Sequence, residues 1–278
     1  MAPLHLPLAI GNLPFTLYIF PSPRSYTSIH HTFFMIFSLK SFWQALIFLT
    51  TLPTPVVDWE RGDLGRAAGY FPAVGFLLGG ILYGVWWGFD LFLPPLIAAV
   101  LVIILWAVLT GGLHLDGLAD CGDGVLAAVS RERRLEILKD SRVGAFGAIT
   151  LVLHLFLKIA LVASLTNPLG LILAPVVARW LLLPTAKRPL ARPGGMGAEF
   201  AATIAPRAMW LGALFPLILG AGLGWAGVLG VVSAVMMMML IWRLAQNRLG
   251  GITGDVFGLV VEMGETAVLL FFVGGLAI

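Results

Sequence analysis

Long apolar stretches separated by short polar breaks dominate the chain. A helix needs about 20 apolar residues to cross the hydrocarbon core of a bilayer, and several of the stretches reach that length. Three pairs of them are joined by uncharged turns, which predicts three helical hairpins and a last span that begins near Val256. The predicted spans are 67–89 with 91–115, 145–165 with 169–186, 208–242 folded about 220–227, and 256–278.

Charged connections alternate with uncharged turns along the chain. The turns near 93–95, 166–169 and 220–227 carry no charge, and most charged residues fall in the connections 56–66, 114–142, 187–207 and 243–255. About seven spans would place every charged connection on one face, which the positive-inside rule makes cytoplasmic. The pattern predicts an all-α, polytopic integral membrane bundle in the inner (cytoplasmic) membrane, with its active site facing the cytoplasm and its carboxyl terminus outside.

The amino-terminal part has a different pattern. Prolines interrupt residues 1–34, and no charged start precedes a continuous apolar core, so this segment is a poor signal peptide. We expect it to be an extension outside the native structure, with the functional chain starting near Met35 and residues 35–278 forming one membrane-embedded catalytic domain. Residues 41–52 are apolar but too short to span, which favours an interfacial or re-entrant helix.

Composition excludes several classes of protein. Hydrophobic residues make up 59% of the chain and charged residues 11%, with a mean hydropathy of +0.98, so the chain is not a soluble globule. The net charge is +3, but no basic run exceeds two adjacent residues, so we expect no nucleic-acid partner. Cys121 is the only cysteine and cannot form an internal disulfide. Neither a P-loop nor a strand-flanked GxGxxG motif occurs.

An acidic stripe lies at the end of the second predicted span. Asp116, Asp120 and Asp123 fall on one face of a helix that turns by about 100° per residue. Clustered carboxylates repel one another unless a cation neutralises them, and hard oxygen ligands favour Mg²⁺. The alternative is a solvated helix end paired with the arginines of 131–134. His114 could act as a general base beside the stripe, or cap the helix.

A second acidic group opens the last predicted span. Asp255 and Glu262 are seven residues apart and nearly eclipsed, and Glu265 lies one turn further on. Asp255 could simply complement the helix dipole. Glu262 and Glu265 fall within an apolar helix, where carboxylates are functional candidates. The two acidic groups could therefore clamp one substrate.

Cations for an anionic substrate are also present. Arg142 ends the large charged connection and could grip a phosphate, or extend to lipid headgroups. Lys158 and Arg179 interrupt predicted spans, and His154 shares the face of Lys158. Either these cations pair with carboxylates of the bundle or they line a cavity for phosphate; we favour the cavity.

Several separated motifs, in order, resemble the adenosylcobinamide-GDP ribazoletransferase (cobalamin synthase) family from about Met35 to the carboxyl terminus. They are Leu-Pro-Thr-Pro at 52–55, Phe-Pro-Ala-Val-Gly at 71–75, Gly-Gly-Leu-His-Leu-Asp-Gly-Leu-Ala-Asp at 111–120, Asp-Ser-Arg-Val-Gly at 140–144, and Gly-Gly-Ile-Thr-Gly-Asp at 250–255 with Glu262 and Glu265.

The resemblance implies an Mg²⁺-dependent transfer in which a hydroxyl of α-ribazole, or of its 5′-phosphate, displaces GMP from adenosylcobinamide-GDP. Adenosylcobalamin or its 5′-phosphate would be the product. On this hypothesis Asp116, Asp120 and Asp123 bind the metal, with Asp255, Glu262 and Glu265 completing the site or holding a second ion. The substrate-binding residues would be Asp140, Ser141, Arg142, Lys158 and Arg179. One of the carboxylates, or His114, would take the hydroxyl proton.

Two alternatives belong to other families. A CDP-alcohol phosphotransferase also uses clustered aspartates, but Asp120 stands where the arginine of its signature is expected. A cation-coupled transporter could hold carboxylates and Lys158 at membrane depth, yet would not need an acidic stripe on one face. Glycine-rich spans permit close helix packing, including packing between copies in a homo-oligomer.

Overall fold

The computed structural model describes residues 38–60, 62–192 and 196–273, so the predicted extension 1–34 lies outside the described residues. Every named element in this part of the chain is helical, which confirms the all-α prediction. In chain order the elements are α1 (Leu39–Leu49), α2 (Asp63–Ala67), η1 (Ala68–Tyr70), α3 (Phe71–Asp90), α4 (Pro95–Leu109), α5 (Leu113–Leu126), α6 (Arg131–Ile137), α7 (Ala145–Ala163), α8 (Gly170–Ala186), α9 (Met196–Thr203), α10 (Pro206–Gly222), α11 (Gly224–Leu249), α12 (Gly254–Leu269) and η2 (Leu270–Phe272).

Helix α8 lies at the centre of the bundle, and nearly all its residues are buried. Glycines let α3 approach it closely. A Cβ atom at Gly75 would lie 2.4 Å from the Pro175 carbonyl oxygen, and one at Gly79 would lie 2.6 Å from Ile172 Cα. Only glycine permits this backbone contact, so the α3 sequence fixes how these two helices pack. Helices α10, α11 and α12 also contact α8.

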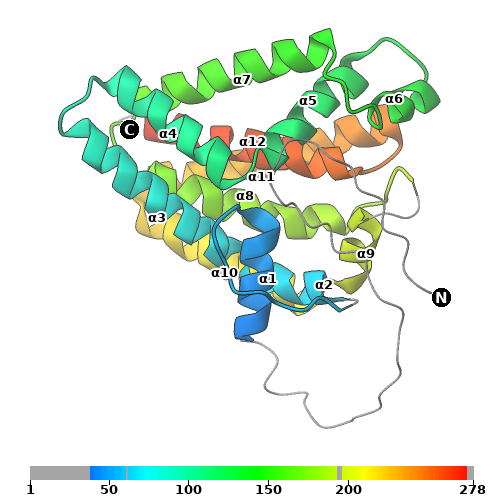
Figure 1. Ribbon diagram of the computed structural model, residues 1–278, viewed down its shortest axis with the longest axis horizontal. Coiled ribbons are helices and arrows are strands. Elements are labelled where there is room, and N and C mark those ends of the chain that lie inside the picture. The colour runs from blue at the N-terminus through cyan, green and yellow to red at the C-terminus, as the bar shows by residue number, and fades with distance from the viewer. Residues whose placement is uncertain (1–37, 61, 193–195, 274–278) are drawn as a thin grey trace.

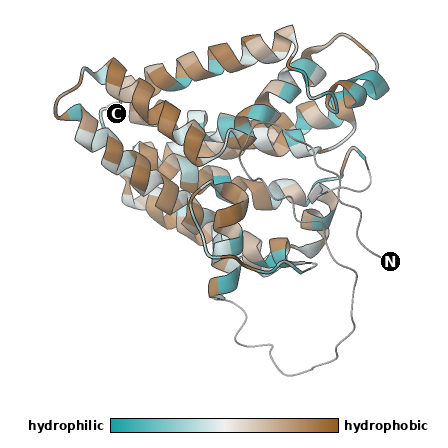
Figure 2. Cartoon of the chain, in the orientation of Figure 1, coloured by the Kyte–Doolittle hydropathy of each residue, from teal (hydrophilic) through white to brown (hydrophobic). Residues whose placement is uncertain are grey.

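Apolar side chains cover much of the outer surface of the long helices. Figure 2 shows hydrophobic residues along α3, α4 and α7, and more polar ones around α5 and α6. Exposed side chains such as Phe156, Trp210 and Met236 would face lipid, because water does not favour an apolar surface of this extent. Three helical stretches, 63–90, 145–163 and 224–249, are long and apolar enough to cross a membrane, and up to five if each of two bent helix pairs is one span. The count of about seven spans stays a prediction.

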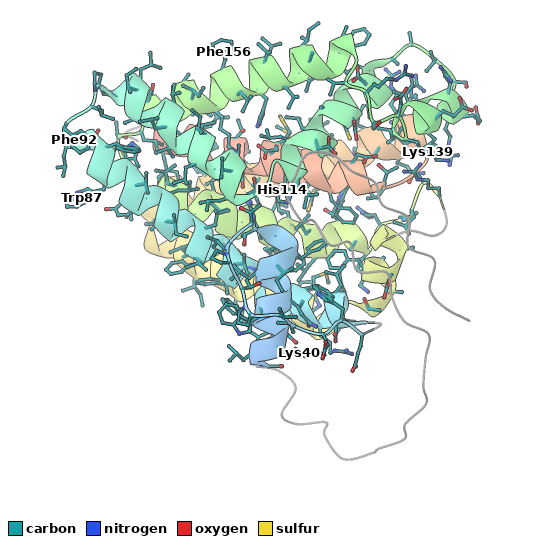
Figure 3. The ribbon with its side chains drawn as sticks, in the orientation of Figure 1. Lys40, Trp87, Phe92, His114, Lys139 and Phe156 are labelled. Carbon is teal, nitrogen blue, oxygen red and sulfur yellow. The ribbon has the colours of Figure 1, made fainter. Side chains whose placement is uncertain are left out.

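The charged and uncharged connections lie at opposite ends of the bundle, as the alternation along the sequence predicts. At the uncharged end, the Thr166 amide donates to the Phe272 carbonyl, so the turn after α7 lies beside the end of α12. At the charged end, Arg131 Nε donates to the Leu249 carbonyl at 2.7 Å. Figure 3 shows Phe92 and Lys139 at these opposite ends.

The prediction of one continuous helix over 91–115 is wrong, because the structure breaks this stretch into two helices. Helix α4 ends at Leu109, and α5 starts at Leu113 along an axis that differs by 93°. Gly111 and Gly112 turn the chain with φ of 60° and 69°, in the left-handed region that glycine occupies without strain. The charged connections 114–142 and 187–207 are themselves partly helical: the first holds most of α5 and all of α6, and the second holds α9. The predicted turn within 220–227 is confirmed. The short helix predicted at 41–52 is present as α1, which runs from Leu39 to Leu49, and its interfacial or re-entrant position stays a prediction.

Candidate active site

Helix α5 begins in the middle of the bundle and carries the acidic stripe toward the charged end (Figures 1 and 3). The stripe is helical, as predicted from its spacing. Asp116 is exposed and Asp120 is half-buried, whereas His114 is only 4% exposed. Within the described residues, no hydrogen bond or ion pair engages the side chain of Asp116 or Asp120. Both carboxylates are therefore free to meet a ligand.

Paired glycines bring α12 against this stripe. A Cβ atom at Gly117 would lie 2.7 Å from the Asp255 carbonyl oxygen, and one at Gly258 would lie 2.8 Å from the His114 carbonyl oxygen. The two backbones thus touch where the helices cross. Asp255, whose side chain accepts a 3.0 Å hydrogen bond from Thr253 Oγ1, comes within electrostatic range of Asp116 and Asp120. The structure therefore brings together the stripe and the first member of the second acidic group.

Asp123 has a different environment. Its carboxylate accepts hydrogen bonds from the backbone amides of Gly144, at 2.7 Å, and Gly147, at 2.8 Å. These amides belong to the N-terminus of α7, where helix amides have no intrahelical partner and the dipole favours a negative charge. Asp123 thus anchors α7 to α5. Its predicted role as a metal ligand stays a prediction, and its oxygens already have partners.

The donor chemistry of the stripe suits Mg²⁺. No three His, Cys, Asp or Glu side chains in the described part of the chain converge into a complete metal site. Mg²⁺ usually does not need such a cage, since it binds one or two carboxylates together with waters and substrate phosphates. Asp116 and Asp120 offer hard oxygen donors without a competing cation. They therefore fit an ion that arrives with a phosphorylated substrate.

A buried ion-pair network links α7, α8 and α12. Lys158 Nζ lies 2.8 Å from Glu262 Oε2 and 2.5 Å from Glu265 Oε2, and Arg179 Nη1 pairs with Glu265 Oε1. His154 Nε2 lies 2.8 Å from Glu262 Oε2. Two carboxylates thus meet one ammonium and one guanidinium. This is the first of the two arrangements considered for these cations, pairing with carboxylates of the bundle, and not the favoured phosphate cavity. The predicted metal role of Glu262 and Glu265 and the predicted substrate role of Lys158 and Arg179 stay predictions, and both would require these pairs to open.

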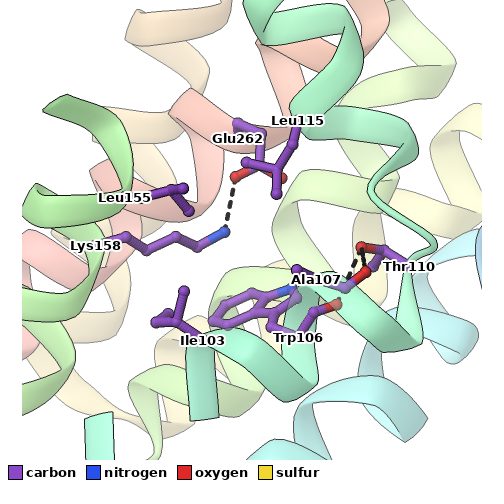
Figure 4. Close-up of a pocket in the computed structure, with 8 residues that line it drawn as sticks. All are labelled: Ile103, Trp106, Ala107, Thr110, Leu115, Leu155, Lys158 and Glu262. Carbon is purple, nitrogen blue, oxygen red and sulfur yellow. Dashed lines mark hydrogen bonds and ion pairs between the residues drawn. The ribbon is translucent and has the colours of Figure 1, made fainter. Parts of the chain in front are cut away.

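A small pocket adjoins this network (Figure 4). The Lys158 ammonium points across it to Glu262 and lies 4.0 Å from the centroid of the Trp106 ring. Aliphatic side chains form most of the remaining lining. Because the two charges neutralise one another, the pocket leaves no free cation for a phosphate.

The predicted substrate-binding residues Asp140, Ser141 and Arg142 lie between α6 and α7 at the charged end. Arg142 donates to both oxygens of Asp140, at 2.9 Å from Nε and 2.6 Å from Nη2. Hydrogen bonds from Arg142 lower the pKa of Asp140 to about 2. The Arg142 side chain is 86% exposed, so it stands at the rim and not inside the acidic cluster.

Arg192 is a residue that the sequence analysis missed. Its Nη1 atom is buried and has no hydrogen-bond partner among the described residues. Asp255 lies within electrostatic range of its guanidinium. The only signal in the sequence is that Arg192 belongs to the charged connection 187–207, where nothing distinguishes it from the three other basic residues of that connection.

Together these features define an α-helical membrane protein with an accessible, unneutralised carboxylate cluster where two helices cross. The chain matches the family described as cobalamin-5-phosphate synthase over residues 41–273, and it belongs to this family. A protein of Desulfitobacterium hafniense named adenosylcobinamide-GDP ribazoletransferase is 38% identical over 252 residues, 85% of this chain and 96% of the relative. A protein of the same name from Pseudomonas fluorescens is 41% identical over 242 residues, 82% of this chain and 97% of the relative. The comparison with solved structures found no match.

Proposed function

We propose that the protein is the transferase that joins α-ribazole, or its 5′-phosphate, to adenosylcobinamide-GDP and releases GMP. The product is adenosylcobalamin or its 5′-phosphate, so the reaction ends cobalamin biosynthesis. The relatives' printed name supports this reaction, because the alignment covers nearly the whole of those proteins. The observation that carries the proposal is the pair of accessible carboxylates without partners, Asp116 and Asp120, in a family of this activity.

The chemistry is a displacement at phosphorus. A ribazole hydroxyl oxygen bonds to the phosphorus that carries cobinamide, and the bond from that phosphorus to the bridging oxygen of the diphosphate breaks. GMP leaves with the electron pair of that bond, and the hydroxyl proton passes to a base. Asp116 and Asp120 are more accessible than His114, so a carboxylate of the stripe is the better placed acceptor.

We assign Mg²⁺ to Asp116 and Asp120, with Asp255 beside them. When bound, Mg²⁺ neutralises charge on the diphosphate oxygens and on the leaving phosphate. The protein contributes the rest by holding α5 against α12, so that the carboxylates keep a fixed separation. A second ion at Glu262 and Glu265 would require their pairs with Lys158 and Arg179 to open.

Arg142 could meet the substrate from the rim of the site. Its guanidinium now engages Asp140, and a phosphate offers the same pair of oxygens to a bidentate donor. If a substrate phosphate replaced Asp140 as the partner of Arg142, the turn that also holds Ser141 would respond to substrate binding.

We also propose that the bundle crosses the inner membrane about seven times, with the carboxylates on the cytoplasmic side. Helices α8 and α12 are short, but other helices surround them, and a buried helix does not itself have to meet lipid. The connections rich in lysine and arginine are at the same end as the acidic stripe, which supports the cytoplasmic assignment.

The experiment is GMP release from adenosylcobinamide-GDP by purified protein in detergent, with α-ribazole 5′-phosphate as acceptor. We expect release coupled to a cobamide product with Mg²⁺, and none after chelation or without the acceptor. Folded protein that releases no GMP would contradict the proposal. Activity with a CDP-alcohol instead would favour the phosphotransferase alternative, and substrate-independent cation uptake in vesicles would favour the transporter.

A further inference from the structure

A short segment, residues 189–191, is held tightly against the backbone just before α12. The Ile252 amide donates to the Pro189 carbonyl at 2.9 Å, and the Ala191 amide donates to the Ile252 carbonyl at 2.9 Å. Gly251, with φ of 155°, permits this contact, because a Cβ atom there would lie 2.6 Å from the Ala191 nitrogen. The segment therefore has a fixed position, and Arg192 follows directly from it.

The fixed segment places Arg192 next to the acidic cluster. Asp255, at the start of α12, lies within electrostatic range of the Arg192 guanidinium, and Asp255 in turn interacts with Asp116. The Nη1 atom of Arg192 is shielded from solvent without accepting atoms around it in the described residues. A guanidinium nitrogen out of water without a partner is unfavourable, so this arrangement favours a ligand that supplies the missing acceptor.

Several other cations at this end already have partners in the protein. Arg131 donates to the carbonyls of Leu249 and Ala191, Lys187 donates to the carbonyls of Ala201 and Ile204, and Arg188 lies 4.1 Å from the centroid of the Trp242 ring. Arg142 is paired with Asp140. Within the part of the chain that the structure describes, two arginines retain buried donors without a partner, Arg179 and Arg192. Arg179 already pairs with Glu265 in the buried network, whereas Arg192 lies within electrostatic range of Asp255, beside the stripe of α5.

We propose that Arg192 binds a phosphoryl oxygen of the nucleoside diphosphate substrate. This inference rests on the proposed function and identifies the cationic side of the same site. A guanidinium suits this task because it stays charged and its planar fork matches two phosphate oxygens. Asp116 and Asp120 hold one side of the diphosphate through the cation they bind, and Arg192 contacts the other side directly.

The test compares Arg192→Gln, Arg192→Lys and wild type, each purified in detergent. We expect Arg192→Gln to raise the KM for adenosylcobinamide-GDP and to weaken binding of GDP by about 10- to 100-fold, the range of a lost charged hydrogen bond. Arg192→Lys keeps the positive charge but loses the planar, two-nitrogen donor. Its KM and its GDP affinity should therefore fall between those of wild type and Arg192→Gln. The KM for α-ribazole 5′-phosphate and the Mg²⁺ concentration for half-maximal activity should not change. Arg248→Gln, an exposed arginine in the last turn of α11, is the matched control.

Thermal unfolding of each variant separates binding from a structural role. If wild type is active and Arg192→Gln keeps the KM and GDP affinity of wild type, this inference is overturned and the proposed function stands. A lower unfolding temperature with the GDP affinity of the remaining folded protein unchanged would also overturn it. If wild type releases no GMP but binds GDP through Arg192, the proposed function fails and the phosphate site stands. If folded wild type neither turns over nor binds GDP, both fail.

Discussion

Asp116 and Asp120 lie on one stripe of α5, and no cation in the described residues neutralises them. Like charges held close together cost free energy, since each carboxylate disfavours ionisation of the other. A fold that keeps such a pair at an accessible position loses stability through this repulsion, and a bound cation would remove the repulsion. The same reasoning does not apply to Asp123, whose charge is compensated by two helix amides.

Replacement of Asp116 or Asp120 by Asn should reduce turnover by about 100-fold or more, because the charge that positions the metal and the diphosphate is lost. The unfolding temperature should stay the same or rise, since a repulsion is removed. GMP release and thermal unfolding of the same preparation measure both. Asp90→Asn, at the uncharged end of α3, is the matched control. Near-normal turnover in both variants would remove the metal role.

Asp123→Ala should destabilise the protein, because it removes two charge-assisted hydrogen bonds to α7, each worth about 1.5–3 kcal/mol. The Mg²⁺ concentration for half-maximal activity should stay close to that of wild type. Asp123→Asn keeps one acceptor oxygen and should be intermediate. Thermal unfolding and a magnesium titration distinguish the roles: a stable Asp123→Ala variant with weakened Mg²⁺ dependence would show that Asp123 is a metal ligand.

At the scale of elements, the buried ion pairs decide how α7, α8 and α12 fit together. Glu265 is fully buried between Lys158 and Arg179, so Glu265→Ala leaves two cations sharing one carboxylate. Loss of one partner from a buried pair typically costs about 3–5 kcal/mol, and we expect a much lower unfolding temperature and yield. Glu136→Gln, which breaks an exposed pair with Arg133, should have almost no effect.

The double variant Arg179→Met, Glu265→Leu tests the same network without leaving an unpaired buried charge, because Lys158 keeps its pair with Glu262. It should recover much of the stability lost in Glu265→Ala, since apolar replacements of a buried pair are often neutral. A stable Glu265→Ala variant that had lost Mg²⁺ activation would contradict the structural role and favour the predicted metal role.

The crossing of α5 and α12 depends on Gly117. Gly117→Ala would place a methyl group against the backbone of Asp255, and a backbone cannot rotate away as a side chain does. We expect a loss of about 1–3 kcal/mol in stability and a larger loss of turnover, because the carboxylates on the two helices separate. Gly80→Ala on α3, where no atom lies within 4 Å, should behave as wild type in both assays. Normal turnover of Gly117→Ala would mean that the crossing does not set the site.

Local spacing predicts some of these elements, and packing decides the others. The i, i+4, i+7 spacing of Asp116, Asp120 and Asp123 predicts their common helical face, because that depends only on neighbours in the chain. The bend before α5 is not predictable in the same way, since apolar residues continue up to Thr110. The sequence does not predict the partners of Lys158 and Asp123 either, since Glu265 and Gly147 lie 107 and 24 residues away from them. For Lys158, composition cannot choose between a buried carboxylate and a bound phosphate.

At the scale of the whole molecule, the broken helix pair α4 and α5 gives the acidic stripe a location that an unbroken span would not. An unbroken helix would carry the carboxylates straight out of the membrane, whereas the 93° bend starts α5 within the bundle. His114 is thereby buried, whereas Asp116, two residues further on, is exposed. The acidic stripe thus lies beside α12, which carries Asp255, and not on a helix that extends away from the bundle.

The orientation of the bundle decides whether these carboxylates meet cytoplasmic substrates. We predict that Lys139→Cys, at the charged end, reacts with a membrane-impermeant maleimide in inside-out vesicles, and that Phe92→Cys, at the opposite end, reacts in right-side-out vesicles or intact spheroplasts (Figure 3). Both side chains lie outside the acidic cluster, and the natural cysteine Cys121 is buried, so wild type supplies the background reading. Reaction of both cysteines from the same side would contradict a bundle that crosses the membrane between its two ends. Reaction with the sides exchanged would place the carboxylates outside the cytoplasm, and the GDP-activated substrate would then have to be exported to reach them.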